Sequence, residues 1–242
     1  MTPTGSHFRL SRALVVGGLT LVTFLAVVPS WASASTPSAS SLLASALSDA
    51  TKGGWVHEDV RVADKGVIVE RAISNVGATQ GFEVQQSGKG STEVYALLAK
   101  KIAYVKGNEI GLEGTFKMSS TNAVKYANTW MLLRPSNPLY AQAVDATTLS
   151  SDFSQAQLTG PLGMSPVGVI AGVEVRSISG VIPATADSPK FQASIYVTAT
   201  GKPLPVGLRE SSGKVSITVT WAKWGVTPTP PAVSGVVPYP KS

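Results

Sequence analysis

An alternation of apolar and polar residues near the C-terminal end constrains this chain more than any other feature. Apolar side chains occupy every second position over residues 191–199 and again over 215–221. Because side chains alternate between the two faces of a β-strand, this pattern predicts strands with one buried face. Similar short runs recur over residues 54–106, where polar turns at 63–66 and 87–90 separate them. Closely spaced turns of this kind are typical of an antiparallel meander.

Other segments have apolar residues at helical spacing. Residues 42–50 predict a helix with a serine cap just before it and Gly53 after its end. Further helices are predicted around residues 116–127, 139–144 and 149–156. The order of helix, strands, helices and strands indicates an α+β fold, in which helices pack on one face of an antiparallel sheet.

Two prolines restrict where one predicted strand in the last third of the chain can lie in the sheet. Residues 168–182 predict one or two strands, and Pro203 and Pro205 flank Leu204 further on. Because proline cannot donate to a ladder of hydrogen bonds, the segment around Leu204 is expected to be an edge strand or a bulged strand.

The N-terminal residues 1–34 are typical of a cleavable signal peptide. Arg9 and Arg12 precede an apolar run over residues 13–28, and residues 32–34 have the small-x-small pattern of a cleavage site. The alternative is an uncleaved membrane anchor, for which this run is short against the roughly 20 residues that span a bilayer. We therefore expect a secreted or cell-envelope protein that is not lipid-anchored.

The remaining chain divides by composition into three parts. Small polar residues over 35–41 predict a flexible lead-in, residues 42–227 predict one domain, and the Pro-rich residues 228–242 predict an extended or disordered tail. The sequence has no cysteine, which excludes disulfides, thiolate metal sites and a lipidated cysteine.

The net charge is +6 with scattered basic residues. Such a surface does not predict nucleic-acid binding and at most favours transient contact with anionic lipid or cell-wall polymer.

Residue types that carry catalysis are few. His57 is the only histidine after the signal segment, whereas a zinc site needs three or four nitrogen or sulfur ligands, so we expect a strand histidine that faces solvent. Residues 211–214 match Ser-x-x-Lys but lie in a polar turn, and residues 88–91 lack the spacing of a phosphate loop. Carboxylates such as Glu58 and Glu83 are expected to be solvated strand residues. We expect no catalytic residue, no metal and no cofactor.

Four tryptophans of the exported part are either core residues or ligand-facing ones: Trp55, Trp130, Trp221 and Trp224. The predicted helices carry few charges, which suits a buried setting better than a fully wet surface. A curved sheet with such helices against its concave face would enclose an apolar cavity.

Residues 190–225 resemble the C-terminal half of the LppX/LprG group of actinobacterial lipoproteins, within the wider LolA-like carriers. The resembling features are a strand leading to residues 201–206, a hairpin, and a strand ending in Trp224-Gly225. Residues 103–107 resemble the group's tyrosine-bearing strand, and residues 128–131 resemble a tryptophan-bearing segment after its middle helices. The lipobox cysteine of the group is absent from this chain.

This resemblance implies a curved antiparallel β half-barrel with amphipathic helices on its concave face, a LolA-like fold. It implies an exported, non-enzymatic binder or carrier of lipids or acylated glycolipids in an apolar cavity. The alternative is a structural or interaction protein of the cell envelope with a filled core. From strand and helix parity, the residues expected to line the cavity are Val67, Val69, Phe82, Val84, Leu98, Phe116, Met131, Leu133, Phe153, Leu158 and Ile195.

Overall fold

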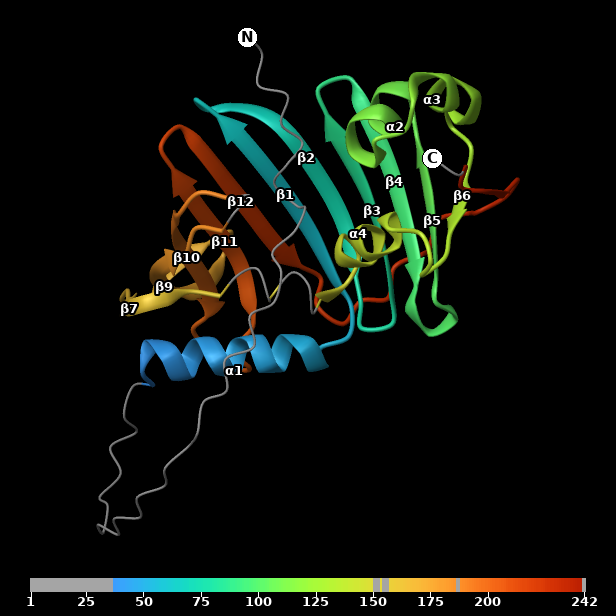
Figure 1. Ribbon diagram of the computed structural model, residues 1–242. Helices are drawn as coiled ribbons and strands as arrows, with labels where there is room; N and C mark the ends of the chain where they lie inside the picture. The colour runs from blue at the N-terminus through green and yellow to red at the C-terminus, as the bar shows by residue number, and fades with distance from the viewer. Residues whose placement is uncertain (1–36, 150–152, 154–156, 186–187, 241–242) are drawn as a thin grey trace, which may run out of the picture.

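The computed structural model describes residues 37–149, 153, 157–185 and 188–240. Its strands form one open, curved sheet of thirteen strands in the order β13-β6-β5-β4-β3-β2-β1-β12-β11-β10-β9-β7, with β8 paired to β9 (Figure 1). Every pairing is antiparallel except that of β13 with β6. The predicted α+β half-barrel is therefore confirmed.

The sheet has two arms that meet where β1 pairs with β12. One arm is a meander of hairpins with tight turns, as the early part of the sequence predicts. Its strands are β1 (Val56–Asp64), β2 (Val67–Val76), β3 (Gln80–Ser87), β4 (Gly90–Leu97), β5 (Ile102–Gly107) and β6 (Met131–Leu133).

The other arm comes from the last third of the chain. Its strands are β7 (Thr159–Met164), β8 (Gly168–Ile170), β9 (Val173–Ile182), β10 (Phe191–Thr198), β11 (Pro205–Ser212) and β12 (Val215–Ala222). Because β11 lies between β10 and β12, the segment after Pro203 is not an edge strand. It is irregular as expected, since the register shifts between Tyr196 and Val197 opposite the start of β11. Pro205 is tolerated there because it is the first residue of the strand.

Four α-helices occur among the described residues. Helix α1 (Ala39–Lys52) crosses the end of the second arm, while α2 (Glu109–Phe116), α3 (Ser120–Tyr126) and α4 (Leu139–Asp145) lie over the first arm (Figure 1). Helix α1 begins inside the predicted lead-in because the side chain of Ser38 accepts a hydrogen bond from the Ser41 N–H and caps it.

Sequence patterns missed one of these helices. Helix α2 was not predicted because glycine at two of its positions lowers helix propensity. The side chain of Asn108 caps it by accepting from the Gly111 N–H at 2.8 Å. The predicted signal peptide and most of the predicted helix over 149–156 fall outside the described residues.

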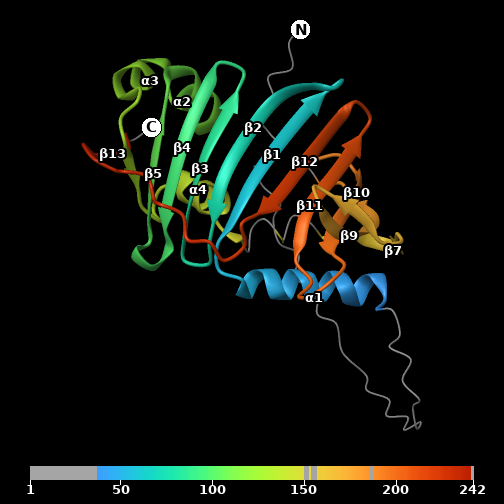
Figure 2. The ribbon, with the colours of Figure 1, turned by 180° about the vertical axis from the view of Figure 1, so that it is seen from behind.

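The Pro-rich tail completes the sheet at its far edge. After β12 the chain runs to β6, where β13 (Val237–Pro238) pairs in parallel (Figure 2). The Val237 N–H donates to the Trp130 carbonyl at 3.0 Å, and the Tyr239 N–H donates to the Leu132 carbonyl at 3.1 Å. The described tail is therefore extended where it pairs with β6.

Candidate functional site

One face of the sheet is buried, and we call it the inner face. In β1 the buried residues Val56, Glu58 and Val60 alternate with half-buried ones. Their partners on β2 are also buried, and they include Ser74 opposite Glu58 and Ala72 opposite Val60. The helices cover this face, so it is the face on which a ligand of a half-barrel would lie.

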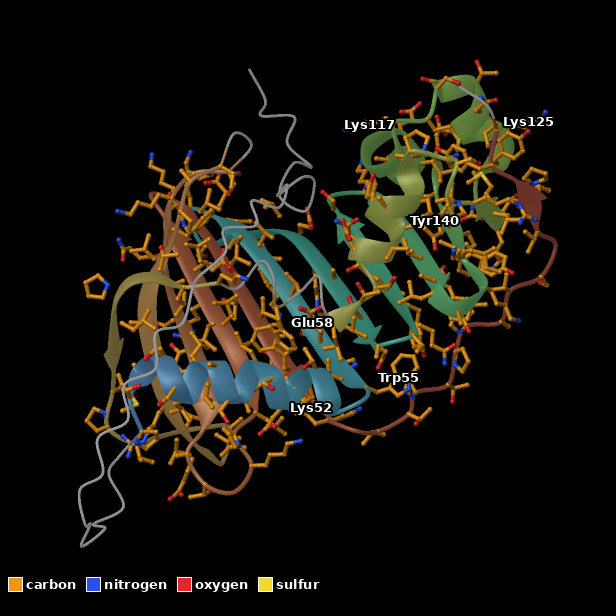
Figure 3. The ribbon with its side chains drawn as sticks, turned by 60° about the horizontal axis from the view of Figure 1, so that its bottom comes forward. Lys52, Trp55, Glu58, Lys117, Lys125 and Tyr140 are labelled. Atoms are coloured by element: carbon orange, nitrogen blue, oxygen red, sulfur yellow. The ribbon has the colours of Figure 1, made fainter. Side chains whose placement is uncertain are left out.

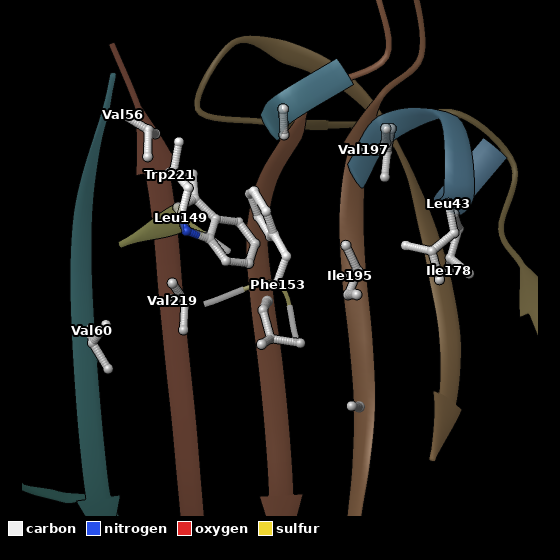
Figure 4. Packing of buried hydrophobic residues seen from close by; sticks show 14 of the residues in the cluster. Leu43, Val56, Val60, Leu149, Phe153, Ile178, Ile195, Val197, Val219 and Trp221 are labelled. Atoms are coloured by element: carbon white, nitrogen blue, oxygen red, sulfur yellow. The ribbon is translucent and has the colours of Figure 1, made fainter. Parts of the chain in front are cut away.

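The second arm carries a large apolar cluster, which we call the α1 cluster. Leu43, Ala46 and Ala50 of α1 pack against side chains from β1 and the second arm (Figure 4). The Phe153 ring lies 5.7 Å from that of Trp221 and 6.3 Å from that of Trp224, measured between centroids. Other members are Val56, Val60, Ile178, Ile195, Val197, Leu208 and Val219.

The first arm carries a separate cluster, which we call the α2 cluster. Leu112 and Phe116 of α2 are buried, with exposed fractions of 0% and 2%. They pack with Ala143 of α4 and with side chains of β4, β5 and β6. The other members include Val94, Ala96, Ala103, Val105, Met118, Ala123, Met131 and Leu133.

A polar row crosses the inner face next to these clusters. Glu58, Ser74 and Glu83 are direct cross-strand neighbours on β1, β2 and β3, and all three are buried. The Ser74 hydroxyl donates to Oε2 of Glu83 at 3.0 Å. Figure 3 labels Glu58 on this face between α1 and α4. Glu58 and Glu83 are therefore not the solvated strand residues that the sequence predicted.

Trp221 lies at the border between the polar row and the α1 cluster. It is opposite Glu58 in the register of β1 and β12, and only 3% of it is exposed. Its indole Nε1 is buried and donates to no acceptor that the structure describes. The indole of Trp224, by contrast, donates to the Pro205 carbonyl at 3.1 Å. Since a buried N–H without an acceptor costs about 1–3 kcal/mol, the Trp221 donor is the polar group here most suited to a ligand.

The eleven residues predicted to line a cavity fall into three places. Leu98, Phe116, Met131 and Leu133 belong to or contact the α2 cluster. Phe153, Leu158 and Ile195 belong to or contact the α1 cluster. The last four lie elsewhere: Val67 and Val69 are exposed near the tip of the β1–β2 hairpin, and Phe82 and Val84 flank the buried Glu83 on the other face of β3.

Sequence reasoning missed the polar row and the distinct role of Trp221. An acid between two apolar residues, such as Glu83 between Phe82 and Val84, normally predicts that the acid faces solvent. The signal that could have found the row is the register of hairpins β1–β2 and β2–β3, which brings Ser74 between the two carboxylates.

His57 and Trp130 have no role in a site that the described residues form. His57 is half-buried on β1, where its Nδ1 lies 3.3 Å from Oδ1 of Asn75. Trp130 is buried beside Lys106, whose Nζ lies 4.9 Å from its ring centroid. Within the described ranges, no group of three or more His, Asp or Glu side chains is placed to hold a metal ion. Nor does any helix of those ranges combine the length and apolar character needed to cross a membrane.

Two hollows open at the surface of the described part of the chain, and the second is lined in part by Phe116 and Met118 of the α2 cluster. One, of about 670 Å³, is on the polar face of the second arm and includes Ser179 and Ser194, whose hydroxyl oxygens are 2.9 Å apart. The other, of about 910 Å³, lies at the β6 edge between α2, α3 and the tail.

The sequence matches no protein-family model, and it matches no curated protein. Among solved structures it is similar to the Mycobacterium tuberculosis lipoprotein LppX, with 20% identity and a TM-score of 0.50 over 79% of this chain and 99% of LppX. Similarity to LprF from Mycobacterium bovis has 14% identity and a TM-score of 0.49 over 80% of this chain and 96% of LprF. A DUF1329 family protein from Desulfovibrio piger has 6% identity and a TM-score of 0.28 over 80% of this chain and 96% of its own. The chain therefore has the fold of the lipoprotein LppX, which confirms at the level of fold the resemblance to the LppX/LprG group.

Proposed function

We propose that this protein is an exported binder or carrier of lipids or acylated glycolipids, and that the ligand lies on the inner face beside α1. The fold shared with the lipoprotein LppX supports a role at a lipid-rich site. The signal-peptide pattern of residues 1–34 supports export. No step of this role requires a catalytic residue.

The observation that carries the proposal is the buried indole N–H of Trp221. It lies where apolar side chains of the α1 cluster meet the polar row of Glu58, Ser74 and Glu83. An acylated molecule has chemical groups in the same order as this site: an acyl chain, an ester or amide carbonyl, and a polar head. The carbonyl would accept from Trp221, which satisfies a donor whose burial is otherwise costly.

Binding would draw its free energy from the acyl chain. Each methylene removed from water contributes about 0.8 kcal/mol, so an acyl chain needs no charged anchor to be held. The polar row would then receive hydroxyl groups of the head, because carboxylate oxygens accept hydrogen bonds from hydroxyls. Leu43, Phe153 and Ile195 are the side chains that the chain would contact by this arrangement.

The test is mass spectrometry of an organic extract of the protein purified from its native source. We expect a bound acylated molecule in the extract of the unchanged protein and a reduced amount from Trp221→Phe. Trp130→Phe is the control, since Trp130 lies outside the α1 cluster and contacts Lys106. An extract without lipid would remove the basis of the proposal.

A second candidate is a structural or interaction protein of the cell envelope. The observation that favours it is the dense aromatic contact of Phe153 with Trp221 and Trp224, because these rings fill space beside α1. In this case an environment-sensitive apolar dye would gain no fluorescence on mixing with lipid-extracted protein. A carrier with its ligand removed would instead bind the dye between α1 and the sheet, and the fluorescence would rise.

A further inference from the structure

The hollow at the β6 edge joins an apolar floor to a polar rim. Phe116 and Met118 are buried beneath it, with exposed fractions of 2% and 8%, and Leu132 and Leu139 are half-buried in its walls. Its volume of about 910 Å³ is in the range of about 300–1,000 Å³ found for small-molecule sites. Most of its remaining lining is proline, serine and asparagine, so the rim offers neutral polar groups.

The charges of this groove have one sign. Lys117 and Arg134 line it, and none of its lining residues is acidic. Both side chains are exposed, and neither forms an ion pair with any residue in the described part of the chain. Figure 3 labels Lys117 at the end of α2. The backbone of Lys117 is held by the turn after α2, where its φ is +52°.

One wall of the groove is the C-terminal tail. Tyr239 is held through both its backbone and its side chain. Its N–H donates to the Leu132 carbonyl, and its hydroxyl donates to the Phe116 carbonyl at 3.3 Å. The phenol of Tyr239, like any tyrosine, is neutral at physiological pH and does not repel an anion, and burial raises its pKa further, to about 12. The wall is therefore built by specific contacts and adds no negative charge.

We propose that this groove is a second binding site, for a single-chain anionic amphiphile, with the chain against the half-buried Leu132 and Leu139, above the buried Phe116 and Met118, and the anionic group between Lys117 and Arg134. The one-signed charge selects an anion, and the apolar floor selects a molecule with a hydrocarbon chain rather than a free inorganic anion. The site lies at the β6 edge, away from the α1 cluster, and does not require that the inner face hold a ligand.

Two matched double variants of the full-length protein test this site. Lys117→Asn with Arg134→Gln removes both cations of the groove. Lys65→Asn with Arg209→Gln removes the same charge elsewhere, and Lys65 has the same backbone conformation as Lys117, with φ of 50° against 52°. Asparagine tolerates this left-handed conformation, so the lysine changes place no new strain on either turn.

The probes are dodecanoate and dodecanol, titrated below the concentrations at which they aggregate. We expect dodecanoate to bind the groove variant about tenfold more weakly than the unchanged protein, while the control variant stays within about twofold. We also expect dodecanoate affinity to fall as salt is added. Equal affinity of the two double variants, or equal affinity of dodecanol and dodecanoate for the unchanged protein, would overturn the proposal.

Amide NMR of the same titrations separates this site from the inner face. Occupation of the groove shifts the backbone amides of Lys117 and Tyr239, whereas occupation of the inner face shifts the indole N–H of Trp221. If only Lys117 and Tyr239 respond, the groove stands and the carrier function loses support. If only Trp221 responds, the proposed groove site is wrong and the carrier function gains support.

Discussion

The α1 cluster and the α2 cluster cover the same sheet in different ways. Helix α2 approaches β4 backbone to backbone: a Cβ added at Gly111 would lie 2.1 Å from the Ser91 carbonyl oxygen. Asn108 tightens this contact by accepting from the N–H groups of both Gly111 and Ser91. Helix α1 instead contacts the sheet through side chains such as Leu43. A contact made by side chains can repack around a ligand more readily than one made by two backbones, so the proposed lipid site lies on the α1 side.

Gly111→Val gives the largest expected effect, because the added atoms have no space beside Ser91. We expect the free energy of unfolding to fall by about 3 kcal/mol or more. Chemical denaturation measures it. Gly114→Ala in the same helix is the control, since nothing lies within 4 Å of its added Cβ. Alanine is the better helix former by about 1 kcal/mol, so this variant should be more stable than the unchanged protein. Equal losses in both variants would show that α2 does not pack as described.

Truncation of one buried leucine in each cluster compares their roles directly. Leu43→Ala and Leu112→Ala should each lower the free energy of unfolding by about 2–5 kcal/mol, because both side chains are buried. Only Leu43→Ala should also lower the amount of lipid that copurifies with the folded protein. If Leu112→Ala lowers it equally, the ligand is not confined to the α1 side.

Trp221→Phe should affect binding more than folding. The variant loses some apolar contact, which destabilises the fold, and it also loses a buried donor without an acceptor, which stabilises it. Because these effects offset each other, the free energy of unfolding should change by about 1 kcal/mol or less. Affinity for an acylated ligand should fall by about fivefold, the value of one hydrogen bond. Calorimetric titration of lipid-extracted protein checks this, and an unchanged affinity would exclude the proposed bond.

The smallest expected effect concerns the polar face of β1 and β2, in the first arm beside the junction of β1 with β12. Burial raises the pKa of Asp59, but hydrogen bonds from Arg61 at 2.8 Å and from Arg71 at 2.9 Å outweigh it and lower that pKa from 3.8 to about 2. The ion pair therefore stabilises the fold above pH 3.8, and this contribution is lost as the pH falls towards 2. Asp59→Asn should flatten the acid dependence of unfolding over that interval.

This acid effect should be independent of either cluster. Denaturant unfolding at several pH values, with and without Leu43→Ala, provides the comparison. Because Asp59 lies on the face opposite the α1 cluster, the two changes should add. A large departure from additivity would mean that the two faces of β1 are coupled.

Most of the fold could be predicted from periodicity. The alternation over residues 191–199 gives β10, and the helical spacing after residue 42 gives most of α1. Helix α2 could not be predicted, because the glycine that lowers its helix propensity is the residue that lets it touch β4. At Gly111 the low helix propensity of glycine disfavours a helix, whereas the close contact with β4 requires glycine. The helix forms because the contact outweighs the propensity.

The candidate site could be predicted only in part. Alternation shows which residues of a strand share a face, but not which face is covered. The apolar character of Phe82 and Val84 predicts that these two residues face the core. The hydrogen bond between Ser74 and Glu83 instead allows β3 to bury its acid. Membership of Ile195 and Phe153 in a buried cluster follows from their apolar spacing. The exposed Val67 and Val69 lie at a hairpin tip away from the helices, which strand parity cannot reveal.

The most direct measurement is photocrosslinking with a lipid that carries a diazirine on its acyl chain, followed by mass spectrometry of the peptides. A ligand beside α1 predicts crosslinks in peptides that contain Leu43, Ile195 or Trp221, and their loss on competition with unlabelled lipid. Crosslinks confined to the β6 edge, or spread over the surface without competition, would contradict the assignment of the lipid to the inner face.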